Sequence, residues 1–172
     1  MSLSAKNLFT VRPFGRAGGL IAGIALAAWT FMGCGHPYEV ATPTGFVDLE
    51  DRYDDGDEEY RATTADGVVI GVRAYDNEPY AERTFLVRAI ENQLRLGRGY
   101  SLLASKEVAA KDGTKGTQLR FGHDEPSGPH LYILTVFTDE DYVYLHEAAG
   151  KKELVEKAEK SIDWSLREFR PD

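Results

Sequence analysis

The chain has 172 residues, of which 42% are hydrophobic and 28% are charged, and its formal net charge is −8. This composition excludes a wholly disordered chain, a fibrous protein and a polytopic membrane protein. A single cysteine excludes an internal disulfide scaffold and a zinc site built from cysteines. The acidic balance argues against nucleic acid as a partner, because phosphate binding needs basic patches.

The first 33 residues differ from the rest of the chain in charge. They contain three cations, Lys6, Arg12 and Arg16, and no acid, and an apolar run over residues 20–29 follows. A basic start before a short apolar run is the layout of a secretory signal peptide. We therefore predict a helical signal peptide over residues 1–33. Its positive flank is expected to stay in the cytoplasm, so the rest of the chain is expected to be exported.

The only cysteine directly follows this segment, in the sequence Phe31-Met32-Gly33-Cys34. These residues resemble the signal of bacterial lipoproteins, in which an aliphatic residue and two small residues precede the cysteine. Gly33 and Cys34 match that pattern, whereas Phe31 replaces the usual leucine and Met32 is larger than usual. The resemblance implies cleavage before Cys34, which would carry diacylglyceryl and palmitate chains. The protein would then be anchored by lipid to a bacterial membrane, the outer rather than the inner one, and its domain would face the periplasm or the exterior.

Two other interpretations of this segment remain open. Residues 17–38 carry no Asp, Glu, Lys or Arg, so they could form an uncleaved single membrane span. Alternatively, Ala25-Leu26-Ala27 could be an ordinary cleavage site that releases a soluble protein. Without residues 1–33, which carry three of the 20 cations and none of the 28 acids, the net charge would be −11. Anionic lipid would repel such a domain, so a lipid chain would be its main attachment to the membrane.

Residues 34–43 are predicted to form a linker that carries the lipid on Cys34. Its two prolines predict an extended backbone. A single globular domain is expected over residues 44–172. Near its start, residues 48–59 hold eight acids and one arginine, which predicts a solvated loop.

Short β-prone runs separated by turn residues predict an antiparallel sheet. Two of these runs flank Asp66-Gly67, which is the strongest hairpin signal in the chain. The predicted strands are residues 60–65, 68–75, 100–108, 117–122, 130–138 and 142–147.

Apolar residues at helical spacing predict two helices. The first opens at Asn77, as a cap before Pro79, and ends near Gly97. The second spans about residues 151–169. Together with the strands, they predict an α+β fold in which an antiparallel sheet of about six strands packs against two main helices.

Two short motifs, Pro43-Thr44-Gly45-Phe46 and Ile162-Asp163-Trp164-Ser165, bound this arrangement. The arrangement resembles the PsbP-like fold, whose members open with a Pro-x-Gly-aromatic turn and end on an Ile-x-x-Ser-Phe helix. Leu166 stands here in place of that Phe. The group includes photosystem II extrinsic proteins, a Ran-binding protein and bacterial envelope lipoproteins. It shares no single activity, so the resemblance implies a fold and not a reaction.

Motifs for catalysis or metal binding are weak. His123-Asp124 and His130 flank one loop, and His146-Glu147 ends a strand, but no H-E-x-x-H spacing occurs. The acidic stretch does not fit a calcium-binding loop, because Tyr53 and Ala62 stand where oxygen ligands are required. No serine lies in G-x-S-x-G. We therefore predict no catalytic residue, no metal site and no cofactor.

The sequence predicts a cell-envelope lipoprotein that is not an enzyme and that binds or scaffolds an unidentified envelope protein. The alternative is a periplasmic module that holds a small ligand or lipid between sheet and helix. For the partner, we predict an interaction face of Tyr142, Tyr144 and His146, which alternation places on one face of the last strand. Val143 and Leu145, on the opposite face, are expected to meet the last helix.

Overall fold

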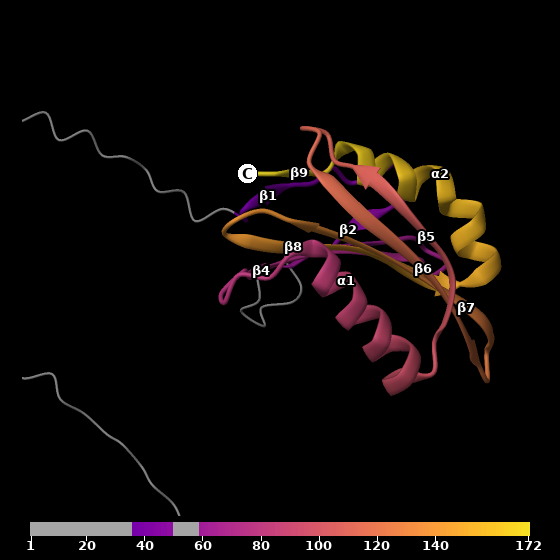
Figure 1. The fold of residues 1–172 in the computed structure, drawn as a ribbon. Helices are drawn as coiled ribbons and strands as arrows, with labels where there is room; N and C mark the ends of the chain where they lie inside the picture. The colour runs from indigo at the N-terminus through magenta and orange to yellow at the C-terminus, as the bar shows by residue number, and fades with distance from the viewer. Residues whose placement is uncertain (1–35, 50–58) are drawn as a thin grey trace, which may run out of the picture. The chain divides into compact units, whose positions relative to one another are not determined.

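The computed structural model describes residues 36–49 and 59–172 (Figure 1). The predicted signal peptide, Cys34 and most of the acidic stretch, with its poor match to a calcium loop, lie outside these residues. Within the described part, no helix combines the length and apolar character that crossing a bilayer needs. In chain order the elements are β1 (Tyr38–Glu39), β2 (Val47–Asp48), β3 (Glu59–Thr63), β4 (Val69–Asp76), α1 (Arg83–Asn92), η2 (Gln93–Gly97), β5 (Ser101–Ala109), β6 (Lys115–Glu125), β7 (Gly128–Thr138), β8 (Tyr142–Lys151), α2 (Lys152–Glu168) and β9 (Arg170–Pro171).

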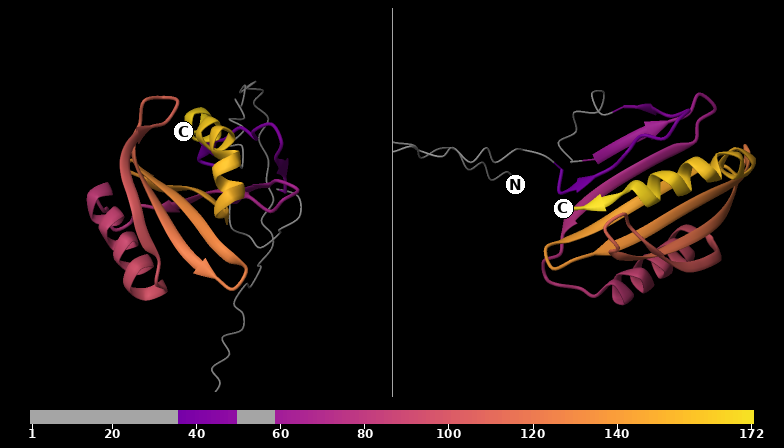
Figure 2. Two further views of the ribbon diagram at one scale, coloured as in Figure 1. Left: turned by 90° about the vertical axis from the view of Figure 1, so that its right-hand side faces the viewer. Right: turned by 90° about the horizontal axis from the view of Figure 1, so that it is seen from above.

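Seven strands form one antiparallel sheet in the order β2-β3-β4-β8-β7-β6-β5, while β1 pairs with β9 separately. α1 covers one face of the seven-stranded sheet and α2 covers the other (Figures 1 and 2). The predicted α+β architecture of antiparallel strands and two main helices is confirmed. The sheet has one strand more than predicted, because the two-residue β2 pairs with β3 at its edge.

Two apolar cores lie on opposite faces of this sheet. On the α2 side, Ile162, Leu166 and Phe169 pack against large side chains such as Tyr144 and Phe137. On the α1 side, the turn of π-helix η2 that extends α1 contributes Leu94 to a second core, which includes Leu119, Phe121, Leu134 and Val136. Alternating residues of β7 and β8 therefore enter different cores, which explains why these central strands are apolar on both faces.

The hairpin predicted around Asp66-Gly67 is present and joins β3 to β4. The Thr64 hydroxyl accepts a hydrogen bond from the Val68 N–H at 3.0 Å, and the Gly67 N–H donates to the Thr64 carbonyl at 3.1 Å. Side chain and backbone together therefore close this turn, as is typical of Ser/Thr turns.

The start of the first helix differs from the prediction. α1 begins at Arg83, and Asn77 lies 3% exposed outside the helix. The Asn77 amide accepts a hydrogen bond from the Ala81 N–H and donates to the Asp139 carbonyl, each at 2.9 Å. This side chain binds the chain before α1 to the β7–β8 turn, and that long-range contact replaces the predicted helix cap.

The chain belongs to the fold from Tyr38 onward. The linker predicted over residues 34–43 is therefore wrong for residues 38–43. Tyr38 is 5% exposed and pairs with Pro171 in the β1–β9 ladder. Its hydroxyl donates to the Val72 carbonyl at 2.9 Å and accepts from the Tyr60 N–H at 3.0 Å. A buried tyrosine with both hydrogen bonds satisfied fixes this segment against the sheet.

Two glycines of β6 offer a matched test of packing. A Cβ at Gly116 would lie 2.5 Å from a ring carbon of Phe137, whose side chain is fully buried. We expect Gly116→Ala to lower the free energy of unfolding by about 1–3 kcal/mol, because the ring has no room to move. Gly122→Ala is the control: its Cβ would lie 3.3 Å from a methyl carbon of Leu103, which is exposed and free to shift. Denaturant titration would contradict this account if both variants lost the same stability.

Candidate functional site

The predicted interaction face is corrected by the structure at two of its three residues. Tyr144 is 0% and His146 is 2% exposed, and both lie beneath α2, in ring contact with Phe169. Tyr142 is half-buried. Side chains alternate along β8 as predicted, but each face of the strand packs against the other helix than expected. Val143 and Leu145, which were expected to meet α2, pack in the core beneath α1. Tyr144 and His146 are therefore inaccessible to a partner.

The polar tips of both buried side chains have partners. The Tyr144 hydroxyl donates to Asp139 Oδ2 at 2.7 Å, and His146 Nε2 lies 3.3 Å from Ser165 Oγ. Burial lowers the pKa of His146 to about 4, so the imidazole is neutral at physiological pH. Both residues thus act as core residues with satisfied hydrogen bonds.

The other histidines do not form a metal site within residues 36–49 and 59–172, where no group of three potential ligands converges. The His123 ring stacks on Tyr100 with 4.7 Å between centroids. His130 Nδ1 lies 2.9 Å from the Gly128 carbonyl in the β6–β7 turn. Each ring is thus accounted for by stacking or by turn geometry.

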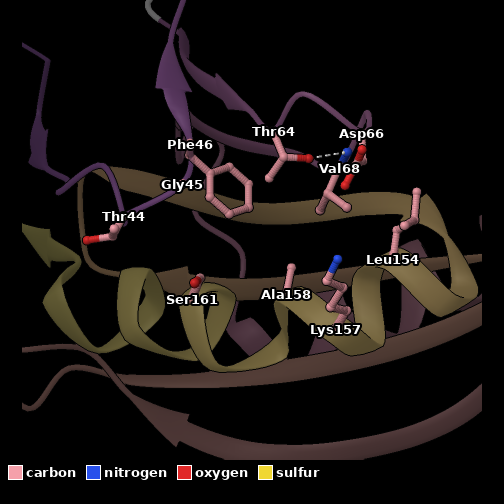
Figure 3. Close-up of a pocket in the computed structure, with 10 residues that line it drawn as sticks. All are labelled: Thr44, Gly45, Phe46, Thr64, Asp66, Val68, Leu154, Lys157, Ala158 and Ser161. Carbon is pink, nitrogen blue, oxygen red and sulfur yellow. Dashed lines mark hydrogen bonds between the residues drawn. The ribbon is translucent and has the colours of Figure 1, made fainter.

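One cavity, which we call the α2 cavity, lies between α2 and the β3–β4 turn (Figure 3). Its volume is about 150 Å³. Phe46, Val68 and Ala158 supply apolar walls, while Asp66 and Lys157 stand at its rim. Ligand pockets measure roughly 300–1,000 Å³, so this cavity holds no more than a small apolar group.

A larger cavity, of about 350 Å³, lies on the α1 side of the sheet. We call it the arginine cavity, because three arginines line it. Its lining residues are Arg61, Val69, Gly71, Arg73, Leu94, Arg98, Tyr100, Tyr132, Glu147 and Ala149.

Glu147 is fully engaged inside the arginine cavity. Arg73 donates to Glu147 Oε2 from Nε, at 3.1 Å, and from Nη2. The Tyr132 hydroxyl donates to the other carboxylate oxygen. Burial, and then the neighbouring Glu147 charge, raise the pKa of Tyr132 well above its usual value of 10. Tyr132 therefore stays protonated and donates to Glu147.

Sequence patterns gave no local signal for the arginine cavity, because its residues come from four strands and the end of a helix. The predicted β3–β4 hairpin could have indicated that two of the arginines lie close together. Its register places Arg61 opposite Gly71. Arg73 lies two positions after Gly71 on β4, so Arg61 and Arg73 lie on the same face of the sheet as diagonal neighbours. The contribution of Arg98 depends on how α1 and η2 pack across the sheet, which no spacing in the sequence indicates.

Comparison with known proteins identifies the fold. No known family and no curated protein matches the sequence. The structure is similar to a cyanobacterial PsbP (CyanoP) from Synechocystis, with a TM-score of 0.56 and 12% identity, covering 90% of this chain and 98% of that chain. The chain has the PsbP-like fold. This confirms the resemblance predicted from the sequence.

Two other solved structures are similar to this chain, with slightly lower TM-scores. The Ran-binding protein Mog1p of Saccharomyces cerevisiae has a TM-score of 0.52 and 13% identity, covering 78% of this chain and 90% of that one. LpqN of Mycobacterium tuberculosis, described as involved in cell envelope biogenesis, has a TM-score of 0.51 and 7% identity, covering 77% and 82%. At such low sequence identities the similarity shows the fold alone, and it does not assign a role to any residue of this chain.

Proposed function

We propose that this protein is an exported cell-envelope lipoprotein, anchored through Cys34, whose acidic domain has a non-catalytic binding or scaffolding role in an envelope complex. The basic and apolar layout of residues 1–33 and the position of the sole cysteine support the anchor. LpqN, a protein of the same fold, is described as involved in cell envelope biogenesis, which is compatible with this setting. We expect anchoring in the outer rather than the inner membrane, with an envelope protein as the partner.

The observation that carries the proposal is where the fold begins. Tyr38, four residues after Cys34, is already buried, and the Asp172 N–H donates to the Pro37 carbonyl at 3.2 Å. In the sequence, the sole cysteine thus lies between an apolar segment and β1, a position that supports an anchor. Free cysteines in exported proteins are exposed to oxidation, and acylation would remove that liability.

The same observation limits how far the domain stands from the membrane. Four residues span at most about 14 Å, so a lipid on Cys34 would hold the β1–β9 end close to the headgroups. The β7–β8 turn, with Asp139, Glu140 and Asp141, lies at this end (Figure 1). Because these carboxylates are repelled by anionic lipid, this end favours a basic partner protein over the bilayer itself.

Membrane fractionation of Cys34→Ala tests the anchor. We expect the wild-type protein in the membrane fraction at processed size, and the variant to lose its membrane retention. A variant that stays in the membrane at unprocessed size would favour the single-span alternative. His36→Ala, which keeps the cysteine, is the control and is expected to behave as wild type. A Cys34→Ala protein that stays processed and membrane-bound would contradict the proposal.

A small-ligand role is the second candidate, and the α2 cavity favours it. The cavity lies between α2 and the β3–β4 turn, and a space of about 150 Å³ with partly apolar walls can hold a group the size of benzene. Its volume suits the end of an apolar ligand rather than a whole lipid chain.

A further inference from the structure

We propose that the outward face of α1 and η2 is a self-association surface, through which two copies of this chain pair as antiparallel helices. This inference goes beyond the proposed anchor and does not depend on Cys34. It rests on where the exposed apolar side chains lie, on their spacing along the helix and on the charges at the two ends of the helix.

The three most exposed large hydrophobic side chains of the described residues lie on or just before one helix. Leu96 is 86% exposed, and Tyr80 and Phe85 are each 65% exposed. Phe85 lies in α1, Leu96 lies in η2, and Tyr80 lies in the loop that leads into α1. Single exposed apolar residues are normal on a protein surface, whereas several on one face indicate contact with another molecule.

The fold does not use this outward face for its own packing. Leu86, Val87 and Ile90, on the inward face of α1, pack against the core that contains Leu94. The exposed positions lie between these inward ones at helical spacing. Figures 1 and 2 show α1 on the outside of the sheet, and no other described element lies beyond it. Within the described part of the chain, the outward face is therefore open to a partner.

The outward residues have the spacing of a helix-pairing surface. Four exposed residues, separated by four, three and four positions, form one stripe along the helix: Phe85, Ala89, Asn92 and Leu96. The large apolar side chains stand at the two ends of the stripe and the smaller side chains in the middle. Two such stripes in antiparallel orientation place each Phe85 against the partner's Leu96. The small Ala89 then lies near the centre, where it allows the helices to approach closely.

Charge along the same surface changes sign from one end of the helix to the other. Residues 74–82, before α1, carry three exposed acids and no base. Residues 88–98 carry three exposed arginines and one acid, Glu91, which pairs with Arg95 at 2.8 Å. An antiparallel pair places the acidic end of each copy beside the basic end of the other, whereas a parallel pair would bring like charges together.

This pattern favours a second copy over a lipid surface. An anionic bilayer would attract the basic end of the stripe and repel its acidic end. A second copy related by a two-fold axis complements both ends at once, because the same surface lies on both sides of the contact. The net charge of −8 opposes association at long range, but physiological salt largely screens charges more than about 8 Å apart. The contact is only one helix wide, so we expect a weak and reversible dimer.

Disulfide cross-linking of the full chain in detergent tests this geometry. In a Cys34→Ala background an introduced cysteine is the only thiol. We expect Ala89→Cys, near the two-fold axis, to form a disulfide-linked dimer under mild oxidation. Phe85→Cys alone should form none, because its two copies would lie about 16 Å apart along the helices, beyond the reach of a disulfide. Phe85→Cys combined with Leu96→Cys should cross-link, because these positions face each other.

Lys160→Cys, at an exposed position of α2, is the matched control and measures cross-linking by random collision. We expect it to give no dimer above background at protein concentrations where Ala89→Cys cross-links. Equal cross-linking of Ala89→Cys and Lys160→Cys would overturn the proposal. Efficient cross-linking of Phe85→Cys alone would also overturn it, because that result indicates a parallel pair.

A charge placed in the stripe tests its apolar contacts. In the Ala89→Cys chain, Leu96→Glu should lower the cross-linked fraction at least about tenfold, because a buried leucine contact is worth more than 1.4 kcal/mol. Leu103→Glu, the same replacement at an exposed leucine of β5, should leave the fraction unchanged. Both side chains are exposed, so neither replacement is expected to unfold the domain. Equal effects of the two replacements would contradict the assignment of the contact to the stripe.

Labelling of Leu96→Cys with a maleimide distinguishes a second copy from a lipid surface. We expect labelling to slow as the protein concentration rises, and to be the same in detergent micelles with and without phosphatidylglycerol. Protection that requires phosphatidylglycerol and does not depend on protein concentration would assign the stripe to a membrane surface and overturn the proposal.

Discussion

Replacing Tyr38 with alanine is expected to lower the free energy of unfolding by about 3–5 kcal/mol, the usual cost of truncating a large buried aromatic side chain. The ring is 5% exposed and packs near Phe169 with 6.0 Å between centroids. The substitution also removes the acceptor of the Tyr60 N–H and the donor to the Val72 carbonyl. Urea titration followed by circular dichroism measures the loss.

The neighbouring residue of the same strand provides the control. Glu39 is exposed and pairs with Arg170 on the surface, in an ion pair whose partners are both largely exposed. Because exposed ion pairs contribute about 0–1 kcal/mol, Glu39→Ala should leave stability nearly unchanged. If Tyr38→Ala were as stable as Glu39→Ala, residues 36–39 would be a linker and not part of the fold. The same account predicts that a chain truncated to residues 40–172 is less stable than one that begins at residue 36.

Acid is expected to destabilise the domain through His146. Its pKa in the fold is about 4 and its ordinary value is 6.5, so the unfolded chain binds the proton first as the pH falls. The stability that this depressed pKa contributes is therefore present above pH 6.5 and is lost between pH 6.5 and 4. The loss reaches about 2 kcal/mol at pH 5 and about 3 kcal/mol across the whole interval.

Comparing variants isolates this contribution from that of the carboxylates. We expect His146→Gln to lose about 2 kcal/mol less than wild type between pH 7.5 and 5, since glutamine does not titrate. His123→Gln, in which a half-buried histidine stacked on Tyr100 is replaced, is the matched substitution outside the α2 core. Identical pH profiles for wild type and His146→Gln would show that the protonated imidazole is tolerated beneath α2.

The elements that local pattern determines were predicted well. The hairpin at Asp66-Gly67 and the stripe that buries Ile162 and Leu166 both depend on residues close in sequence. The strands β5 to β8 were found for the same reason, with their ends displaced by a few residues. Periodicity within one element is sufficient to predict that element, because the backbone repeats fix which residues share a face.

Features that depend on distant contacts were not predicted. The pairing of β1 with β9 joins residues at opposite ends of the described chain, and neither two-residue strand has a pattern of its own. Alternation separated Tyr144 from Leu145 correctly, but which face α2 covers depends on how the chain folds back after β8. Asn77 was assigned to a helix end for the same reason, since its partner Asp139 lies 62 positions away.

The candidate site shows the same limit more strongly. Three arginines scattered over 38 positions gather in one cavity, and only the register between β3 and β4 links two of them in the sequence. The proposed anchor at Cys34 rests on sequence position alone, because a signal of that kind would be recognised along the unfolded chain and would need no fold.

The intact mass of the protein purified from bacterial membranes tests the central proposal most directly. We predict a chain that begins at Cys34 and carries the added mass of a diacylglyceryl group and a further acyl chain. The corresponding peptide should release the two ester-linked fatty acids of the diacylglyceryl group on mild alkaline hydrolysis. A chain that begins at Met1 with an unmodified Cys34, or one cleaved after Ala27 without lipid, would contradict the proposal.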